Sequence, residues 1–327
     1  MDINELKTDD NIKELINNNL ETTANVSISD EIQLNDKVAA LYKLPSGRAL
    51  TKNETYSITS AEDTKIILLI GPSASGKTTI ETTLYQMFQR SGVGDYFFAG
   101  SNTLHGYEQR SYYTRMKSNQ STSSTPRTSR GVQETFLHLK TWNYKTNYFQ
   151  NFLFGDLSGE DFQSHIADIN AMQKDFSFIK SVDYLVAVLD GKLISDKKNR
   201  NGTFEELAQL LRTICDAGLI TNHTKIQVAL SKYDIVIENK TSTEAFIARI
   251  KSELQQRLKK YCKEIDFYYI AAMPDGNVKM EIGYGIEELL NSWGTKKTYK
   301  VSFDDNKKID VKSEFNKHYK KLLGEHL

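Results

Sequence analysis

The chain has 327 residues, which suits one large domain with extensions or two small domains. Hydrophobic residues make up 39% of the sequence and charged residues 26%, a balance typical of a soluble globular protein. Its 42 Lys and Arg residues equal its 42 Asp and Glu residues, so the net charge gives no case for a nucleic-acid or anionic-membrane partner.

Cysteine content and hydropathy further limit the class of protein to which this chain can belong. Cys215 and Cys262 are too few for a disulfide framework or a zinc site, and we expect both to be reduced thiols. The N-terminus has no apolar signal-peptide core, and no segment approaches the roughly 18 apolar residues that a membrane span needs. We therefore expect a cytoplasmic protein without a membrane span.

Residues 1–60 are predicted to be a polar N-terminal extension. Asn, Asp, Glu and Thr dominate its beginning, where Ile12, Ile16 and Leu20 indicate one weakly amphipathic helix in an otherwise mobile segment. Residues 39–60 contain a Pro-Ser-Gly turn signal, and we interpret them as a lead-in that packs on the following domain.

The domain predicted at 61–295 opens with a phosphate-binding motif. An apolar run at 66–70 predicts a buried parallel strand, the next residues match G-x-x-x-x-G-K-[ST] in full, and a helical pattern follows. Strand, glycine loop and helix form the context that this motif requires. The predicted nucleotide contacts in it are Gly71, Ser73, Ala74, Ser75, Gly76, Lys77, Thr78 and Thr79.

Each residue type in this loop has a chemical reason. Gly71 and Gly76 let the backbone curl so that successive N–H groups point at phosphate oxygens, and the start of the helix adds partial positive charge. We expect Lys77 to reach the β- and γ-phosphates of a nucleoside triphosphate and the Thr78 hydroxyl to ligate Mg²⁺.

A long polar region at about 95–131 follows that helix. We predict a helix at about 102–117 and then a Ser/Thr-rich segment with turn signals. A loop of this length inside a compact domain is more often functional or mobile than structural.

A hairpin is predicted next, with strands at 132–141 and 148–154 joined by a short turn. A D-x-x-G sequence, Asp156 to Gly159, comes directly after its second strand, and a helix is predicted over about 161–179. Asp156 at a strand end suits the Mg²⁺ shell, and the Gly159 N–H suits a contact with the γ-phosphate.

Buried strands then alternate with helices to the end of the domain. The remaining strands are predicted at 182–189, 225–230 and 266–270. Capping-box patterns at 203–206 and 241–244 predict the starts of two helices, and apolar residues at 286–293 mark the last one. The alternation predicts an α/β fold with a doubly wound, mostly parallel sheet.

Ser231-Lys232-Tyr-Asp234, after the second of these strands, has the chemistry of a guanine reader. The Asp234 carboxylate is able to accept hydrogen bonds from the N1–H and the N2 amine of guanine, whereas adenine presents an acceptor at N1 and no amine at C2. The Lys232 stem suits the face of the base. Ala271 and Ala272, after the last strand, are expected to offer backbone amides to the guanine oxygen.

Residues 296–327 are predicted to form a lysine-rich tail with one helix. Val311, Phe315, Tyr319 and Leu322 share one stripe, which favours docking on the domain. A partner-binding helix is the alternative, and membrane-surface binding is the least favoured because acidic residues interrupt the basic face.

In this order, the phosphate loop, D-x-x-G, [NTS]-K-x-D and a small-residue base loop resemble a Ras-like P-loop GTPase of the TRAFAC class. More closely, the chain resembles the bacterial double-GTPase group of TRAFAC GTPase-like proteins. The resemblance is carried by LPSGRALT, GPSASGKTT, FAGSNTLHGYEQR, TPRTSRG, FLHLK, DLSGE, VLDGK and SKYD. These segments span about 45–235, and the G-domain pattern continues to about 293.

The resemblance implies a Ras-like G domain that binds GTP or GDP with Mg²⁺. It also implies nucleotide-controlled assembly with a protein effector or adaptor, and a role in bacterial conflict or phage-defence systems. It places switch I in the region 95–131, where Thr128 is the first candidate for the Mg²⁺-sensing threonine and Thr125 the second. Arg127 and Arg130 are either surface residues or the source of an arginine finger in cis.

Two residues depart from the family pattern. Glu160 stands where many GTPases have a water-orienting glutamine, and an ionised carboxylate cannot donate a hydrogen bond. We therefore expect slow intrinsic hydrolysis. Ser231 replaces the commoner Asn or Thr and still supplies a hydroxyl. The candidate catalytic residues are Lys77, Thr128, Gly159 and Glu160.

Three functions are consistent with these motifs. The first is a GTP-binding switch with slow Mg²⁺-dependent hydrolysis, in which γ-phosphate contacts order residues 118–131 and 156–175. The second is a pseudo-GTPase scaffold that binds nucleotide without turnover, which Glu160 favours. The third is a P-loop ATPase or nucleotide kinase, for which the SKYD sequence stays unexplained and no LSGGQ signature is present.

Overall fold

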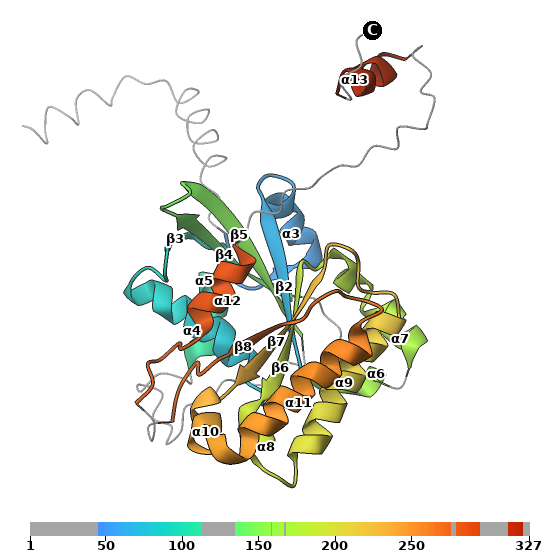
Figure 1. Ribbon diagram of the computed structural model, residues 1–327. Helices are drawn as coiled ribbons and strands as arrows, with labels where there is room; N and C mark the ends of the chain where they lie inside the picture. Colours follow the sequence, from blue (N-terminus) through green and yellow to red (C-terminus); the bar gives the residue numbers. More distant parts are fainter. Residues whose placement is uncertain are drawn as a thin grey trace, which may run out of the picture.

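The structure of the protein is a computed structural model. The residues that it describes are 45–112, 135–157, 159–166, 168–275, 279–294 and 313–322. They carry one sheet of eight strands with helices on both faces (Figure 1). The strands are β1 (Leu50–Thr51), β2 (Thr64–Ile70), β3 (Tyr96–Gly100), β4 (Thr135–Asn143), β5 (Tyr148–Asp156), β6 (Tyr184–Asp190), β7 (Lys225–Ser231) and β8 (Asp266–Tyr269).

Helices connect most of these strands. They are α3 (Lys52–Thr59), α4 (Lys77–Arg90), α5 (Leu104–Ser111), α6 (Gly159–His165), α7 (Ile169–Asp175), the 3₁₀ helix η3 (Ser177–Ser181), α8 (Gly191–Ser195), α9 (Arg200–Asp216), α10 (Tyr233–Glu238), α11 (Lys240–Leu258), α12 (Ile286–Trp293) and α13 (Glu314–Leu322). Within the described residues, no helix combines the length and the apolar character needed to cross a bilayer.

The sheet is mostly parallel. Its described strands run in the order β1-β4-β5-β2-β6-β7-β8, and β3 pairs with the outer side of β4. Strands β5, β2, β6, β7 and β8 are parallel to one another, whereas β1, β3 and β5 are antiparallel to β4. The predicted doubly wound α/β sheet is therefore confirmed, and the carboxyl ends of its five parallel strands lie at one edge.

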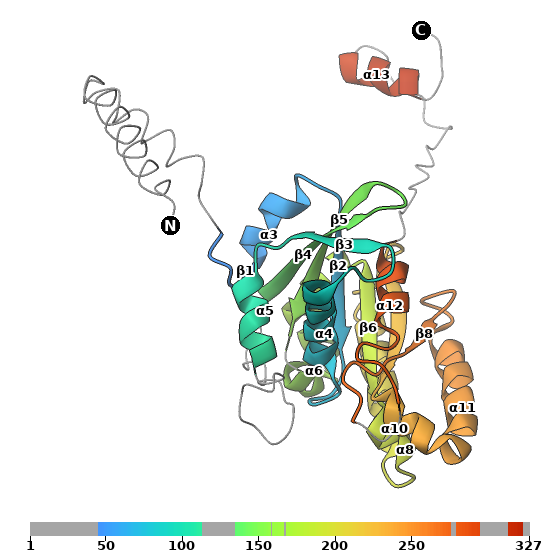
Figure 2. The same ribbon diagram turned by 90° about the vertical axis from the view of Figure 1, so that its left-hand side faces the viewer.

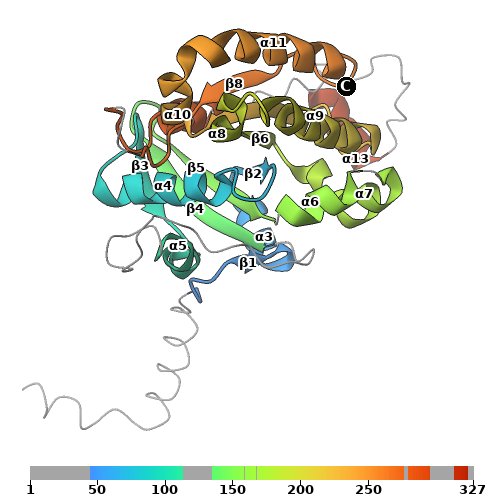
Figure 3. The same ribbon diagram turned by 90° about the horizontal axis from the view of Figure 1, so that it is seen from below.

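Strand β2 divides the core into two layers because successive side chains of a strand point to opposite faces. Leu68 and Ile70 pack with residues of α9 and α11, whereas Ile67 and Leu69 pack with residues of α4 and α12. Figure 3 shows α4 and α5 on the opposite side of the sheet from α9 and α11. These four β2 side chains are at most 1% exposed, so the strand that leads into the glycine loop is fixed from both sides.

The prediction of one helix over 161–179 is wrong. The structure has α6, α7 and η3 in this region. The Asp168 side chain accepts a hydrogen bond from the Ala171 N–H at 2.9 Å and so starts α7 as a new helix. A run of apolar residues with helical spacing does not reveal such a break.

Both capping-box predictions are also wrong. Helix α9 begins at Arg200 and α11 at Lys240, so the predicted caps lie inside helices. The Thr203 hydroxyl donates to Asn199 O at 3.1 Å, and the Thr243 hydroxyl donates to Asn239 O at 2.8 Å. Each hydroxyl thus bonds a carbonyl one turn back instead of capping a helix start.

Strand β3 is an element that the sequence patterns did not predict. Its side chains do not alternate between buried and exposed, because Phe97 and Phe98 are 44% and 42% exposed at the border of the sheet. Helix α5 follows it and ends at Ser111. Residues 113–134, which include the rest of the predicted 102–117 helix, lie outside the described residues.

The two extensions are described only in part. The lead-in supplies β1 and α3, and Leu50 in β1 pairs with Phe136 in β4. The predicted helix around Ile16 lies outside the described residues. In the tail, Phe315 of α13 is 87% exposed, so it does not occupy the docking position that its stripe predicts (Figure 1).

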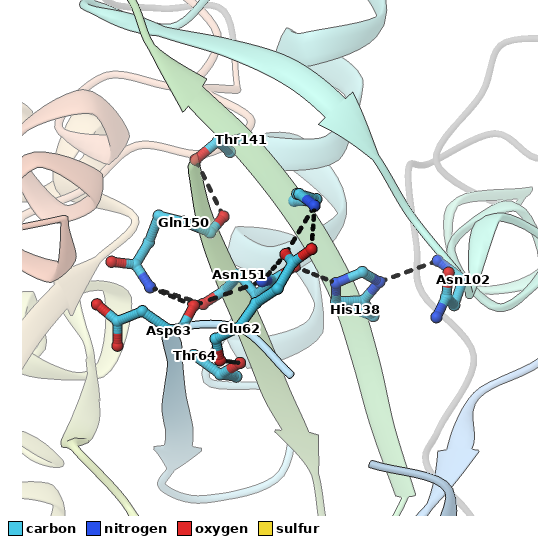
Figure 4. Close-up of polar contacts among 9 residues, drawn as sticks. Glu62, Asp63, Thr64, Asn102, His138, Thr141, Gln150 and Asn151 are labelled. Atoms are coloured by element: carbon cyan, nitrogen blue, oxygen red, sulfur yellow. Dashed lines mark hydrogen bonds and ion pairs between the residues drawn. The ribbon is translucent and has the colours of Figure 1, made fainter. Parts of the chain in front are cut away.

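A polar network with His138 and Asn151 buried at its centre crosses β4 and β5 away from the carboxyl edge (Figure 4). His138 Nδ1 accepts from the Asn102 N–H at 3.0 Å, so Nε2 carries the proton and donates to Asn151 Oδ1 at 3.0 Å. Asn151 Nδ2 donates to Glu62 Oε2 at 2.7 Å, and Lys140 Nζ donates to Glu62 Oε1 at 2.7 Å. We call these five residues the β4–β5 network. Burial lowers the pKa of His138, which fits this neutral ring.

Candidate functional site

The segments with predicted functional residues meet at the carboxyl edge of the sheet. They follow β2, β5, β7 and β8, and these strands are parallel, so their carboxyl ends point the same way. Figure 2 shows the β2–α4 turn, the start of α6 and helices α8 and α10 gathered at this end of the sheet. Distant parts of the sequence therefore form one site.

The glycine loop between β2 and α4 has a strained, tightly curled backbone. Gly71, Ala74 and Gly76 have φ values of 145°, 63° and 100°, in the region that favours glycine. A Cβ at Gly71 would lie 2.6 Å from Val188 O, so no side chain fits there. The buried Ser75 hydroxyl has no hydrogen-bond partner among the described residues. A strained loop with an unpaired polar atom suits a ligand-binding role.

Lys77 lies over this loop at the start of α4. Its Nζ donates to Gly71 O at 2.9 Å and to Pro72 O at 2.8 Å. The ammonium group is therefore held inside the curve of the loop, next to the N-terminus of a 14-residue helix. Both features favour negative charge at this position.

We call residues 231–234, which hold the predicted guanine contacts, the base-reading loop. Ser231 and Lys232 attach this loop to the glycine loop. Ser231 Oγ donates to Ser75 O at 2.7 Å, and Lys232 Nζ donates to Ala74 O at 3.0 Å. The predicted phosphate and base contacts thus belong to one connected structure. The predicted cover of the base by the Lys232 stem fits this position.

Asp234 is buried and has one carboxylate oxygen in use. It is 6% exposed, and Oδ2 accepts from the Asp275 N–H at 3.0 Å. Oδ1 has no hydrogen-bond partner among the residues that the structure describes. A carboxylate oxygen without a protein partner is able to accept a hydrogen bond from a ligand, which suits the recognition of an N–H group.

The two alanines after β8 differ from each other. The Ala271 N–H donates to Tyr284 O at 3.1 Å, so this amide is already used within the protein and the expectation that it meets the guanine oxygen is wrong in this structure. The Ala272 carbonyl accepts from the Gly283 N–H at 3.0 Å, and its own N–H has no partner in the described part of the chain. Only Ala272 retains a free amide for a base.

The two described residues that are predicted to ligate Mg²⁺ come from the end of one strand and the start of one helix. Asp156 ends β5, which is parallel to β2, and Thr78 lies in the first turn of α4. The Thr78 hydroxyl has no protein partner in the described segments. In those segments no group of three or more His, Cys, Asp or Glu residues is placed to hold a metal.

The remaining predicted residues are placed in part. Gly159 and Glu160 begin α6, which starts three residues after the last residue of β5, and their backbone lies at the same edge of the sheet. Thr128, its alternative Thr125, and both candidate arginines lie outside the described residues. Their predicted roles at switch I stay predictions.

Two residues at this edge had no predicted role. Asp190 ends β6 with its side chain 2.5 Å from Lys232 Nζ, and Gly191 begins α8 directly beneath the Ser231 carbonyl. A polar Asp-Gly pair at the end of a buried strand is a detectable signal. Only the pairing of β6 with β7 shows what the pair contacts.

A profile of the family Double-GTPase 2 matches residues 65–294, which is more than half of the chain. No curated protein matches the chain.

Two solved structures are similar to the chain at low identity. The signal recognition particle receptor SRb-GTP/SRX complex from Chaetomium thermophilum is 18% identical with a TM-score of 0.35, and the match covers 65% of this chain and 93% of that one. The FeoB G-domain from Methanococcus jannaschii is 17% identical with a TM-score of 0.35, and the match covers 71% of this chain and 96% of that one. The family profile, not these two structures, confirms the resemblance seen in the motifs. The chain belongs to the Double-GTPase 2 family of TRAFAC-class P-loop GTPases.

Proposed function

We propose that the protein is a GTP-binding switch that hydrolyses GTP slowly, depends on Mg²⁺ and controls a partner protein. In this proposal residues 61–295 form the switch domain, and 1–60 and 296–327 are extensions. The observation that carries it is the direct attachment of the base-reading loop to the glycine loop, at Ser75 O and Ala74 O. One ligand that carries both guanine and phosphates fits this arrangement better than separate ligands do.

The chain's own residues would act by binding and orientation. Lys77 and the amides at the start of α4 would hold the phosphates and neutralise charge during an in-line attack of water on the γ-phosphate. The Gly159 N–H would contact the γ-phosphate. Asp234 would accept from the guanine N–H groups, with the Ala272 amide near the guanine oxygen. Thr78, Asp156 and Thr128 would ligate Mg²⁺, which would neutralise charge on the β- and γ-phosphates.

Glu160 supports slow GTP turnover, and it also supports a second function, that of a pseudo-GTPase. An ionised carboxylate near the γ-phosphate cannot donate a hydrogen bond and raises the local negative charge. A pseudo-GTPase that binds GTP without hydrolysis has the same features. Phosphate release from purified protein separates the two, since any turnover that requires Lys77 identifies an enzyme.

The base reader is tested by Asp234→Asn. An amide donates where the carboxylate accepts, so GTP affinity should fall by about 10- to 100-fold while xanthosine triphosphate, whose C2 oxygen accepts from an amide, should bind better. Calorimetry with non-hydrolysable analogues measures both affinities. Asp168→Asn, which changes an exposed helix cap in α7, is the matched control and should leave both unchanged. Unchanged GTP affinity in Asp234→Asn would remove the assignment of this residue.

The motifs resemble those of bacterial double-GTPases. This resemblance supports a role beside an effector or adaptor in a conflict or phage-defence system. Expression of the native gene neighbourhood with wild-type or Lys77→Ala protein, followed by phage plating, tests it. Equal plating efficiencies would contradict a defence role that depends on nucleotide.

A further inference from the structure

Asp190, the last residue of β6, and Gly191, the first residue of α8, lie against the base-reading loop. The β6–β7 register pairs Asp190 with Ser231, so the ends of these strands lie side by side. Asp190 is 5% exposed, and the two oxygens of its carboxylate have different partners. Oδ1 accepts from the Lys192 N–H at 2.9 Å and the Leu193 N–H at 3.4 Å, which caps α8, whereas Oδ2 lies 2.5 Å from Lys232 Nζ.

Gly191 permits the close approach of the same loop. A Cβ at this position would lie 2.2 Å from Ser231 O, 2.7 Å from Val236 Cγ2 and 3.1 Å from Lys232 O. The first of these distances is shorter than any real contact and involves backbone, which cannot move aside. Any side chain at Gly191 would therefore displace the loop that carries Lys232 and Asp234.

Lys232 needs such support because its backbone is strained. Its φ of 50° is left-handed, a conformation that residues other than glycine adopt at a cost. Its ammonium group has two partners, Asp190 Oδ2 and Ala74 O. Without the carboxylate, the glycine-loop carbonyl alone would hold the ammonium, and a carbonyl is a weaker partner than an ion-paired carboxylate.

We infer that the Asp190-Gly191 turn positions the base-reading loop and that Asp190 acts on guanine affinity through Lys232. The inference rests on the proposed function and deepens it. Asp190 makes no contact with the base in this role. It holds the lysine stem over the base and keeps the loop in place against the glycine loop.

Asp190→Asn separates this role from helix capping. The amide oxygen still caps α8, because Oδ1 accepts as before, but the NH₂ group faces the Lys232 ammonium. Loss of one charge-assisted contact should weaken GDP and GTP binding by the same factor, about 10- to 100-fold. Binding of inorganic tripolyphosphate, which has no base, should stay the same. Asp168→Asn is the matched cap variant and should leave all three affinities unchanged.

A double-mutant cycle with Lys232→Met identifies the route of the effect. If Asp190 acts through the lysine, Asp190→Asn should cause no further loss of GDP affinity in the Lys232→Met background. Asp190→Glu, which keeps the charge and shifts it by one methylene, replaces the amide variant in the same cycle if that variant does not fold.

Two results would overturn the inference. Either wild-type GDP affinity in Asp190→Asn, or a loss that persists undiminished in the Lys232→Met background, shows that Asp190 does not position the lysine. Failure of the proposed function itself looks different, because wild-type protein would then bind GDP no better than ADP.

Discussion

Two polar clusters in this protein differ in which of their polar atoms lack a hydrogen-bond partner. The β4–β5 network lies within regular strands, and both ring nitrogens of His138 and the amide of Asn151 have protein partners. The cluster at the carboxyl edge lies in loops with left-handed residues, and Ser75 Oγ and Asp234 Oδ1 have no partner among the described residues.

This difference distinguishes polar groups that stabilise the fold from polar groups that are able to bind a ligand. A polar network whose buried atoms are hydrogen-bonded within the protein contributes to stability, so its removal lowers the free energy of unfolding. Polar atoms without a protein partner, in loops with left-handed residues, are able to bond a ligand, so their alteration lowers affinity. The two clusters should therefore respond in opposite ways to mutation.

The largest effect is expected for Lys77→Ala at the carboxyl edge. Under the proposed function, removal of the ammonium group that would hold the phosphates should lower GTP turnover by about 10²- to 10³-fold. Lys145→Ala serves as the control, because this lysine is 61% exposed in a surface ion pair with Asp95. A phosphate-release assay measures both variants. Turnover that survives Lys77→Ala would place catalysis elsewhere.

Asn151→Ala should lower the stability of the protein without lowering its affinity for nucleotide. It leaves the His138 Nε2–H and one Glu62 oxygen without the amide between them, and an unsatisfied buried group costs about 1–3 kcal/mol of stability. Urea unfolding measures this loss. The GDP affinity of the folded protein should stay within about twofold of wild type, since the network lies away from the carboxyl edge. Lower affinity at unchanged stability would contradict the structural role.

A smaller effect is expected from pH. Burial lowers the pKa of His138, while the Asn151 hydrogen bond and Glu62 oppose this and Lys140 adds to it. The unfolded histidine takes up a proton near pH 6.5, before the folded one does, so protonation favours unfolding. The contribution of His138 is fully present above about pH 6.5 and is lost as the pH falls through its lower folded value.

His138→Gln should make the stability of the protein less dependent on pH below about pH 6.5. Urea midpoints across this range measure the slope. His223→Gln, at an exposed position, is the control and should keep the wild-type slope. An unchanged slope in His138→Gln would show that the network does not depend on the neutral ring.

Local signals in the sequence predicted the parts of the fold that depend on few residues. The strand, glycine loop and helix from Thr64 to Arg90 are confirmed because the motif itself fixes the turn and the apolar runs fix the flanks. The strands β6 and β7 are confirmed because burial on both faces leaves continuous apolar runs, and the predicted edge strand β8 is confirmed although its residues are only half-buried. The motifs also placed Ser231, Lys232 and Asp234 after the strand that holds them.

The errors arise where a tertiary contact decides the outcome. The Thr203 and Thr243 hydroxyls bond carbonyls inside their helices, although the local sequence has the form of a cap. The Ala271 amide is taken by Tyr284, which no local pattern reveals. Asp190 gains its partner only because β6 and β7 pair in one register. The spacing of residues along the chain does not predict these tertiary contacts.

The central claim is that one guanine nucleotide occupies the carboxyl edge. Calorimetry of the wild-type protein with non-hydrolysable GTP and ATP analogues, each with Mg²⁺, tests it most directly. The unpaired Asp234 oxygen predicts a preference for the GTP analogue of at least about tenfold. Equal affinity, or a preference for the ATP analogue, would contradict the account.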